Sequence, residues 1–246
     1  MAAAPVLLIT GASRGIGAAT AKLAGARGFD VAVNYLQDRK AADAVVAAVE
    51  GQGRRAVAIQ ADMGKEEDIA RMFATIDGKL GRLTHFVYNT GIMGASSRVE
   101  AVETKTLRDV LDVNVLGAFL CAKAAIPRIS TKHGGRGGAM VFISSAMATL
   151  GAAGECIWYA ASKAAIESMT VGLARELAQD GIRVNAVAPG PVHTDIHPPG
   201  RLERIVPHVP MGRAGTVDEI AEAVLFLLSE KSSYTDGIVL RVAGAR

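Results

Sequence analysis

The chain has 246 residues, 50% of them hydrophobic and 4% aromatic, with 27 glycines and a formal net charge of +3. This length fits one large domain or two small ones, with a core built from small aliphatic residues. The small charge, without a basic stripe or an aromatic-interleaved motif, argues against nucleic-acid binding. Cys121 and Cys156 have neither metal-ligand spacing nor a CxxC pairing, so we expect two reduced thiols and no metal site.

The start of the chain does not have the pattern of a targeting segment. Residues 1–10 lack the charged beginning and the long apolar stretch of a signal peptide. No run of apolar residues reaches about 18, the length that a membrane span needs. We therefore expect a soluble, cytoplasmic protein that does not bind membranes.

Short apolar runs, typical of buried strands, alternate with longer helical patterns. In chain order we expect a strand at 5–10, a helix at 15–27, a strand at 31–35, a helix at 39–49, a strand at 56–60, a helix at 65–80 and a strand at 84–88. The pattern continues with a helix at 106–130, a strand at 139–144, a helix at 159–179, a strand at 182–188, a helix at 218–228 and a strand at 237–242. Such alternation implies right-handed crossovers and a parallel sheet. We predict a single α/β, doubly wound, Rossmann-type domain over residues 1–246, with seven parallel strands and helices on both faces.

Two segments interrupt this pattern. Residues 134–138 (GGRGG) lead into a strand and not a helix, which favours a flexible turn over a phosphate-binding loop. Residues 191–210 carry five prolines among scattered polar residues. We interpret residues 191–215 as a substrate loop, with a plain connector as the alternative.

A glycine-rich turn at residues 10–17 (TGASRGIG) joins the first strand to the first helix. Gly11 permits the sharp turn, Gly15 lets the backbone approach a pyrophosphate, and Gly17 allows the helix to pack closely on the strand. The N-terminus of the helix also offers free N–H groups and a favourable dipole to phosphates. This spacing of glycines is a weak signal by itself, but its place directly after the first strand predicts dinucleotide binding.

The end of the second strand bears on the choice of cofactor. Residues 34–37 (NYLQ) lack the carboxylate that binds the adenosine ribose of NAD in many such folds. Arg14 and Arg39 could pair with a 2′-phosphate instead, so we expect NADP(H), with NAD(H) or dual use as the alternative. Asp62, after the third strand, could accept a hydrogen bond from adenine, although capping a helix is the commoner role.

Tyr159 and Lys163 are four residues apart near the start of a predicted helix and therefore share one face. A nearby ammonium lowers the pKa of a tyrosine from its usual value of ~10. Such a tyrosine can exchange a proton with a substrate oxygen. A lone YxxxK pair is more often structural, so the prediction depends on its companions.

Together these motifs resemble those of the short-chain dehydrogenase/reductase family over nearly the whole chain. The matching positions are residues 10–17, 61–63 (ADM), Asn89 with Gly91, Asn114, Ser144 with Ser145, 159–163 (YAASK) and 185–190 (NAVAPG). The resemblance implies hydride transfer between a nicotinamide and a carbonyl or alcohol carbon. Residues 150–158 resemble a glucose-dehydrogenase-like subgroup, and the stretch before Tyr159 is one residue longer than in 3-oxoacyl-carrier-protein reductases.

The resemblance also implies roles for individual residues. Tyr159 would be the acid/base, Lys163 would lower its pKa and hold the nicotinamide ribose, and Ser145 would orient the substrate oxygen. Asn114 would hold a water that links Lys163 to solvent, and Ser144 would point to the opposite face of the strand end. Taken singly, Asn114 could be a helix-interior asparagine and Ser145 a plain strand-end hydroxyl.

The same resemblance gives the cofactor contacts. They are Gly11, Ser13, Arg14, Gly15, Ile16, Gly17, Asn34, Asp62, Met63, Asn89, Gly91, Tyr159, Lys163, Pro189, Gly190, Val192 and Thr194. Pro189 and Gly190 could alternatively form an ordinary turn after the sixth strand. Tyr88 and Thr90 are bulkier than the residues usual beside Asn89, which predicts a remodelled pocket wall or an altered cofactor affinity. Trp158 borders either the substrate pocket or a subunit interface.

We therefore expect an NADP(H)-dependent oxidoreductase that interconverts a ketone or aldehyde and an alcohol. The first alternative is a 3-oxoacyl-carrier-protein reductase, which would need a basic docking patch near the pocket mouth. The candidates for that patch are Arg128, Lys132, Arg136, Arg201 and Arg204. The second alternative is a non-catalytic NADP-binding sensor or scaffold, which would not need an activated phenol. The resemblance also implies a homotetramer, with helices 106–130 and 159–179 at one interface and the C-terminal strand at another.

Overall fold

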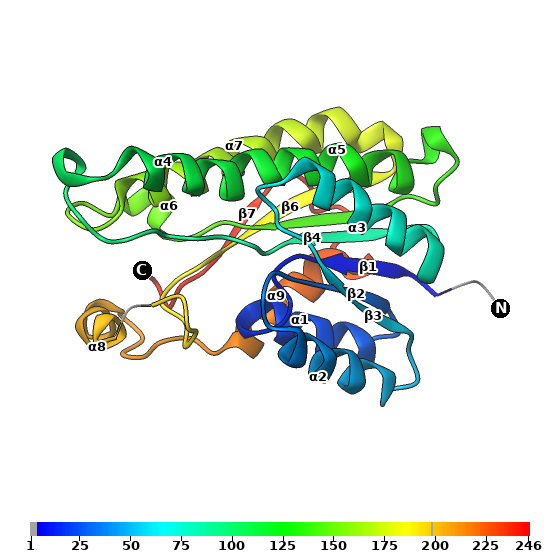
Figure 1. The fold of residues 1–246 in the computed structure, drawn as a ribbon, viewed down its shortest axis with the longest axis horizontal. Coiled ribbons are helices and arrows are strands. Elements are labelled where there is room, and N and C mark those ends of the chain that lie inside the picture. Colours follow the sequence, from blue (N-terminus) through cyan, green and yellow to red (C-terminus); the bar gives the residue numbers. More distant parts are fainter. Residues whose placement is uncertain (1–3, 198) are drawn as a thin grey trace.

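The computed structural model describes residues 4–197 and 199–246. Seven parallel strands form one sheet in the order β3-β2-β1-β4-β5-β6-β7, as Figure 1 shows. The strands are β1 (Val6–Ile9), β2 (Asp30–Tyr35), β3 (Ala56–Gln60), β4 (His85–Tyr88), β5 (Gly138–Ile143), β6 (Ile182–Pro189) and β7 (Val239–Val242). The predicted seven-stranded, doubly wound α/β fold is confirmed.

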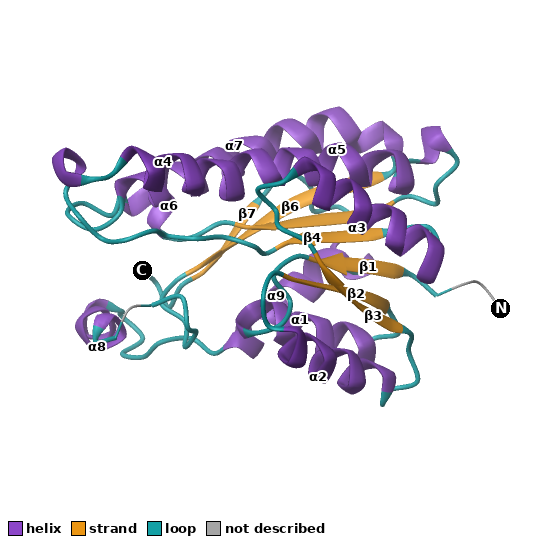
Figure 2. Cartoon of the chain, viewed as in Figure 1, coloured by secondary structure: helices purple, strands orange, loops and turns teal. Residues whose placement is uncertain are grey.

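Helices cover both faces of the sheet (Figures 1 and 2). One layer contains α3 (Glu66–Lys79), α4 (Thr104–Leu111), the π-helix η2 (Asp112–Leu116), α5 (Gly117–Ile129) and α7 (Ile157–Leu177). The other layer contains α1 (Gly15–Ala26), α2 (Arg39–Glu50) and α9 (Val217–Leu228). Shorter elements are α6 (Met147–Leu150), α8 (Arg201–Ile205) and the 3₁₀ turns η1 (Val99–Ala101), η3 (Thr131–His133), η4 (Ala178–Asp180), η5 (Val206–His208) and η6 (Glu230–Ser232).

Two hydrophobic cores lie on the two sides of the sheet. Side chains of a strand point alternately to opposite faces, so Leu8 packs in the core under α3, α5 and α7 while Leu7 and Ile9 pack in the core under α1 and α9. Both faces are buried, which explains why the strand sequences are continuously apolar. The strand order reverses between β1 and β4, and at such a point the chains leave the sheet toward opposite layers and open a crevice at the carboxyl edge.

The structure differs from the predicted elements mainly at helix ends. The helix expected at 106–130 begins at Thr104 and contains the π-helical turn η2, and the helix expected at 159–179 begins at Ile157. The segment 191–215 is not an unstructured loop. It contains α8, η5 and a bridge between Val192 and Gly215, while residue 198 within it lies outside the described residues.

Among the described residues, one helical run, Thr104–Ile129, is long and apolar enough to cross a membrane by length and composition. The run consists of α4, η2 and α5, and its inner face is part of the core through the fully buried Cys121 and Ala125. Its outer face carries the half-exposed side chains of Leu116 and Phe119. We interpret the run as a core helix of the sheet, which leaves one apolar face outward.

Two glycines in helices provide a matched test of this packing. A Cβ at Gly117 would collide with the carbonyl oxygen of Met63 and lie 2.7 Å from the Tyr88 hydroxyl, whereas a Cβ at Gly78 in α3 would meet nothing within 4 Å. We expect Gly117→Ala to lower the free energy of unfolding by about 1–3 kcal/mol through overpacking. Gly78→Ala should raise it by up to about 1 kcal/mol, because alanine favours the helix. Urea denaturation of both variants checks this, and equal effects would contradict it.

Candidate active site

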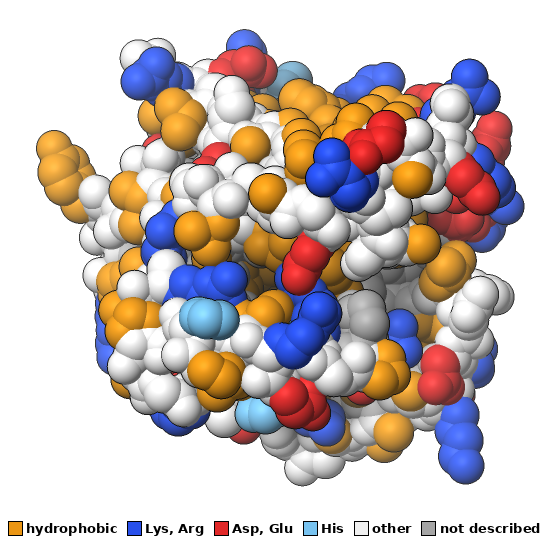
Figure 3. All heavy atoms as spheres, turned by 90° about the vertical axis from the view of Figure 1, so that its left-hand side faces the viewer, with side chains coloured by type: hydrophobic (Ala, Val, Ile, Leu, Met, Phe, Trp, Pro, Cys, Tyr) orange, Lys and Arg blue, Asp and Glu red, His pale blue; other side chains and the backbone are white. Residues whose placement is uncertain are grey.

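A pocket of about 580 Å³ opens at the carboxyl ends of the strands, where β1 and β4 diverge. Its lining comes from the segments that follow β1, β2, β4, β5 and β6. Figure 3 views the molecule from this side and shows a hollow with apolar side chains inside and charged side chains around it. Ligands of doubly wound sheets bind in such a crevice.

The glycine-rich turn forms one wall of the pocket. Gly11 and Gly15 have φ angles of +60° and +56°, a conformation that favours glycine. A Cβ at Gly17 would collide with the carbonyl of Gly11, so the helix could not otherwise pack this closely. Asn34 lies behind the turn, where its Oδ1 accepts a hydrogen bond of 3.0 Å from the Gly11 amide. It therefore supports the turn from the buried side.

The N-terminus of α1 fits a phosphate group. Its N-cap, Arg14, makes no side-chain capping bond, so the first N–H groups of the helix have no cap. Gly15 and Ile16, in the first turn, line the pocket, and Thr194 lies opposite at 3.5 Å from the position of a Cβ on Gly15. Free N–H groups and the helix dipole at a concave wall suit the pyrophosphate of a dinucleotide.

The segment after β2 forms the end of the pocket where an adenosine would lie. Leu36, Gln37 and Asp38 line it together with Arg14. Asp38 was not among the predicted site residues, and its carboxylate accepts a hydrogen bond from the Ala41 amide and caps α2. Arg14 is 74% exposed and 3.8 Å from Asp195.

The second arginine considered for a 2′-phosphate does not line the pocket. The Nε atom of Arg39 lies 2.8 Å from both carboxylate oxygens of Asp43, one turn along α2. Its charge is therefore already paired within its own helix. Of the two predicted cations, Arg14 alone faces the pocket.

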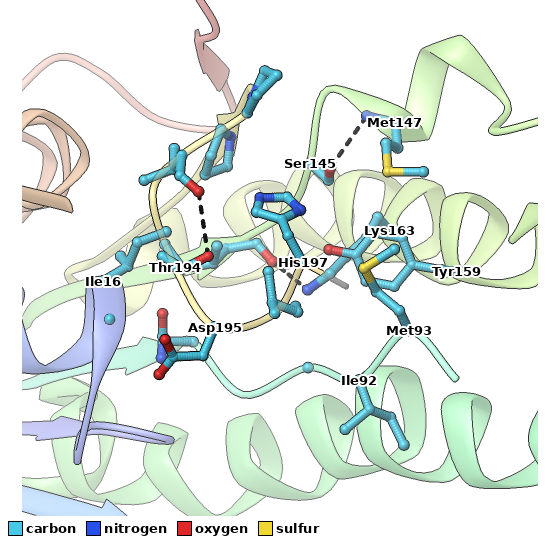
Figure 4. Close-up of a pocket in the computed structure, with 18 of the residues that line it drawn as sticks. Ile16, Ile92, Met93, Ser145, Met147, Tyr159, Lys163, Thr194, Asp195 and His197 are labelled. Carbon is cyan, nitrogen blue, oxygen red and sulfur yellow. Dashed lines mark hydrogen bonds between the residues drawn. The ribbon is translucent and has the colours of Figure 1, made fainter. Parts of the chain in front are cut away.

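Ser145, Tyr159 and Lys163 line the same pocket, as Figure 4 shows. Ser145 follows β5, and Tyr159 and Lys163 lie on successive turns of α7. The ammonium of Lys163 donates a hydrogen bond of 2.7 Å to the Ile143 carbonyl and lies 5.7 Å from the centre of the Tyr159 ring. Ser144 turns the other way and donates to Glu167 on α7, as predicted from strand alternation.

Gly91 makes the close approach of these groups sterically feasible. A Cβ at this position would lie 3.1 Å from the Lys163 Nζ and 3.5 Å from the Asn114 Oδ1. The ammonium and the amide therefore both lie next to the backbone of the segment that follows β4. A side chain at position 91 would force at least one of them away.

Burial controls the protonation of the Tyr159–Lys163 pair. It raises the pKa of Tyr159 to about 12, against a hydrogen bond from Ser145 and the charge of Arg201, which lower it. Burial also lowers the pKa of Lys163 to about 8. The pKa of Tyr159 therefore lies above its usual value and not below it as predicted, because burial outweighs the Ser145 hydrogen bond and the charge of Arg201.

Asn114 lies in the π-helix η2 and is fully buried. Its amide accepts a hydrogen bond from the Ile92 N–H and donates to the Ile92 carbonyl and to Ser162, each at 2.9 Å. It therefore ties the segment after β4 to α7, beside Lys163. These bonds are long-range and unlike the local backbone bonds of an ordinary helix-interior asparagine.

The unusual Tyr88 supports the same π-helix. Its ring packs between Phe86 and Phe142 in the core, and its hydroxyl donates a hydrogen bond to the Val113 carbonyl. Because Tyr88 points into the core, it does not line the pocket, and the predicted remodelling of the pocket wall by this side chain is not seen. Thr90 does reach the pocket, and its buried Oγ1, close to Gly11, has no partner among the described residues.

The remaining wall of the pocket was not predicted. Met93, Met147 and Leu150 give it an apolar surface, while Glu155 and Arg201 bring an ion pair. Trp158 lies behind this wall, where its indole N–H donates to the Met93 carbonyl. Trp158 is 6% exposed, so it packs behind the pocket wall and does not line the pocket itself.

Most of the predicted site residues meet in the pocket. Those that line it are Gly11, Ser13, Arg14, Gly15, Ile16, Asn89, Gly91, Ser145, Tyr159, Lys163, Pro189, Gly190, Val192 and Thr194. Those that do not line it are Gly17, Asn34, Asp62, Met63 and Asn114. Asp62 instead accepts a hydrogen bond from the Gly64 amide, and Met63 is buried against Cys121.

Comparisons with known proteins agree with this geometry. A family model described as enoyl-(acyl carrier protein) reductase matches residues 11–244. The chain is 42% identical to an uncharacterized oxidoreductase, YgfF, of Escherichia coli K12, covering 98% of this chain and 99% of that one. It is 36% identical to a 3-oxoacyl-[acyl-carrier-protein] reductase of Synechocystis, covering 98% and 96%.

Solved structures show the same likeness. A short-chain dehydrogenase from Burkholderia cenocepacia in complex with NADP superposes with a TM-score of 0.92 at 35% identity, covering 98% of this chain and 96% of that one. A blue fluorescent protein from a metagenomic library in complex with NADPH gives a TM-score of 0.92 at 33% identity, covering 99% and 98%. Each likeness spans nearly the whole chain.

The lowered pKa of Lys163 predicts how stability depends on pH. Between pH 8 and 10 the unfolded chain holds a proton on this lysine that the folded chain releases, so the free energy of unfolding should rise with pH relative to Lys163→Met. The expected gain is at most about 3 kcal/mol. Above pH 10 the raised pKa of Tyr159 acts in the opposite direction, which closes the window.

Denaturant unfolding of both proteins across this pH range measures the effect. Lys132→Met, at an exposed lysine, is the control and should follow the wild type. Parallel curves for wild type and Lys163→Met would show that the buried lysine keeps an ordinary pKa.

Proposed function

The chain belongs to the short-chain dehydrogenase/reductase family, and we propose that it is an NADP(H)-dependent enzyme that interconverts a small ketone or aldehyde and the corresponding alcohol. The observation that carries this proposal is that Ser145, Tyr159 and Lys163 line the same pocket as the glycine-rich turn. Reduction of a carbonyl needs hydrogen-bond donors for the substrate oxygen, here the hydroxyls of Ser145 and Tyr159, in the same cavity as the glycine-rich turn that would hold the cofactor.

The residues of the chain would divide the work as follows. A bound nicotinamide would supply or accept the hydride. Ser145 and Tyr159 would donate hydrogen bonds to the carbonyl oxygen, and Tyr159 would pass it a proton as negative charge develops there. Lys163 would hold the ribose hydroxyls and stabilise the phenolate, and Asn114 would hold a water that links Lys163 to solvent.

We assign the cofactor as NADP(H), in preference to NAD(H), on two grounds. Arg14 is exposed at the adenosine end of the pocket, 3.8 Å from the equally exposed Asp195, and Asp38, which lines the same end, already caps α2. The Burkholderia and metagenomic relatives are described with NADP and NADPH. A guanidinium at this place would pair with a 2′-phosphate.

Charge placement favours a small substrate over an acyl thioester on a carrier protein. The names of relatives such as the Synechocystis reductase support the carrier-bound alternative. That substrate would need a basic patch at the pocket mouth, but residues 128–136 precede β5 and so lie at the edge of the sheet opposite the pocket. Of the other two predicted basic residues, Arg201 lines the pocket and is paired with Glu155, and Arg204, on the same helix, is exposed but does not line the pocket. We propose that residues 191–215 form the substrate loop.

We also propose that the chain acts as a homotetramer. The outer face of α4 and α5 carries half-exposed apolar side chains, among them Leu111, Leu116 and Phe119. An exposed apolar stripe of this kind is typical of an interface. The proposal does not affect the assignment of the pocket.

The role of Tyr159 has a direct test. Tyr159→Phe removes the proton donor but leaves the cofactor wall unchanged, so carbonyl reduction should fall by at least about a hundredfold. The dissociation constant for NADPH should change by less than about threefold. Tyr234→Phe, at a fully exposed tyrosine, is the matched control. Unimpaired turnover in Tyr159→Phe would refute the acid/base assignment. Tight NADPH binding by the wild type without reduction of any carbonyl would favour a sensor or scaffold.

The cofactor preference depends on Arg14. Arg14→Ala should weaken binding of NADPH about tenfold, through loss of a charge-assisted hydrogen bond, while binding of NADH changes little. Arg39→Ala is the control, because its guanidinium is paired with Asp43 and lies outside the pocket lining. Fluorescence titration with each cofactor measures both constants. Equal weakening of NADPH and NADH binding would contradict the assignment.

A further inference from the structure

An ion pair between a buried arginine and a partly exposed glutamate joins two walls of the pocket. Arg201 lies in α8, within the segment 191–215, and its side chain is 5% exposed. Its Nη2 and Nε atoms donate hydrogen bonds of 2.9 and 3.3 Å to the Oε2 of Glu155. Glu155 lies in the turn between α6 and α7, four residues before Tyr159. The pair therefore connects the segment 191–215 to the turn that leads into α7.

Arg201 is held from several sides. Its Nη1 donates a hydrogen bond of 2.7 Å to the Nδ1 of His197, which is thereby kept as an acceptor, and its Nη2 lies 3.4 Å from the Met147 sulfur. The Val192 backbone in turn bonds His197. A guanidinium with this many partners is a fixed structural element, because opening it would leave a buried charge unpaired.

The same contacts involve all three nitrogen atoms of Arg201. The Nε and Nη2 groups are directed at Glu155, and Nη1 is directed at His197. A bidentate carboxylate uses two parallel N–H groups of a guanidinium, and the pair that Nε and Nη2 offer already faces Glu155. A carboxylate that bound at this side would have to displace Glu155 first.

The pair closes the end of the pocket away from the cofactor wall. In Figure 4 Met147, which contacts Arg201, lies beyond Ser145 as seen from Ile16 of the glycine-rich turn. The apolar side chains of Leu150 and Ile205 line the same pocket as the pair. A substrate oxygen at Ser145 and Tyr159 would thus have the ion pair beyond it.

We propose that the Arg201–Glu155 pair is a specificity-determining strut that limits the pocket to short carbonyl compounds and excludes substrates with a long thioester arm. The inference rests on the proposed function and deepens it. A compound that ends near Leu150 and Ile205 fits without disturbing the pair. A pantetheine arm attached to the same 3-oxoacyl group would have to pass between the two walls that the pair holds together.

The test uses two substrates with the same reacting carbonyl. Ethyl acetoacetate is short, whereas S-acetoacetyl pantetheine carries the long arm, and both are uncharged. We expect the wild type to reduce the ester with a kcat/KM at least about tenfold higher than that of the thioester. In Arg201→Gln and Glu155→Gln this preference should fall below about threefold, through a lowered KM for the thioester with little change in the kcat and KM for the ester.

Two further variants separate positioning from general damage to the fold. Arg204→Gln removes an exposed arginine from the same helix and should keep the wild-type preference. The charge-swapped double variant Glu155→Arg/Arg201→Glu restores a pair, and we expect it to recover at least half of the lost preference on a logarithmic scale. NADPH binding, measured for each variant, should remain within about threefold of the wild type, because the strut is remote from the cofactor wall.

The possible outcomes distinguish failure of the proposed strut from failure of the proposed reductase function. Equal kcat/KM values for ester and thioester in the wild type, or an unchanged preference in both single variants, would overturn the strut and leave the proposed reductase intact. Failure of the wild type to reduce either compound or any other carbonyl would overturn the proposed function and this inference with it. Loss of the preference in Arg204→Gln as well would show that α8 contributes stability and not selection.

Discussion

Two hydrogen bonds from the side-chain amide of Asn89 join the ends of β1 and β4, the two strands between which the strand order reverses. Its Nδ2 donates to the carbonyls of Thr10 and Gly11, each at 3.0 Å, while the hydroxyl of Thr10 accepts from the backbone N–H groups of Asn89 and Thr90. At the ends of β1 and β4 the ladder stops, and these bonds satisfy groups that would otherwise be unpaired. The glycine-rich turn and the segment that carries Gly91 are thereby fixed to each other.

The pKa values of the site residues are shifted mainly by burial of their side chains and less by attraction between charges. Burial moves the pKa values of Tyr159 and Lys163 in opposite directions, and both shifts favour the neutral forms. The ammonium is bonded to the Ile143 carbonyl, at one end of a short chain of contacts that leads past Gly91 to Asn114. Hydrogen-bonding groups of a ligand would restore part of the solvation that folding removes.

Much of the fold and the site could be predicted because they depend on local signals. These signals lie within short stretches of sequence. They are the apolar strand runs, the glycines at 11, 15 and 17, and the spacing of Tyr159 and Lys163. Contacts between distant segments could not be predicted in this way. Tyr88 meets Phe142 only because β4 pairs with β5, and Arg201 meets Glu155 only after the segment 191–215 folds back to the turn before α7.

Some side chains depend on surroundings that a local motif does not specify. Asn34, a predicted cofactor contact, does not line the pocket, and its amide bridges the glycine-rich turn to the Ala61 carbonyl. Asp38 lies one residue beyond the stretch 34–37 that lacks a carboxylate and does line the pocket. Burial raises the pKa of Tyr159, although the nearby ammonium alone would lower it. In each case the environment of the side chain, and not its identity, decided the outcome.

The π-helical turn η2 changes which residues of the helical run 104–129 face the core. A π-turn holds one residue more than an α-turn, so residues on either side of it are out of phase by about 100°. Upstream of the turn Val110 faces the core, and downstream Ala118 and Cys121 do. Deleting a single residue here would leave a longer, straighter α-helix but rotate Asn114 away from Ile92 or pull Val113 off Tyr88. Small insertions and deletions that surface loops absorb would therefore be costly at this position.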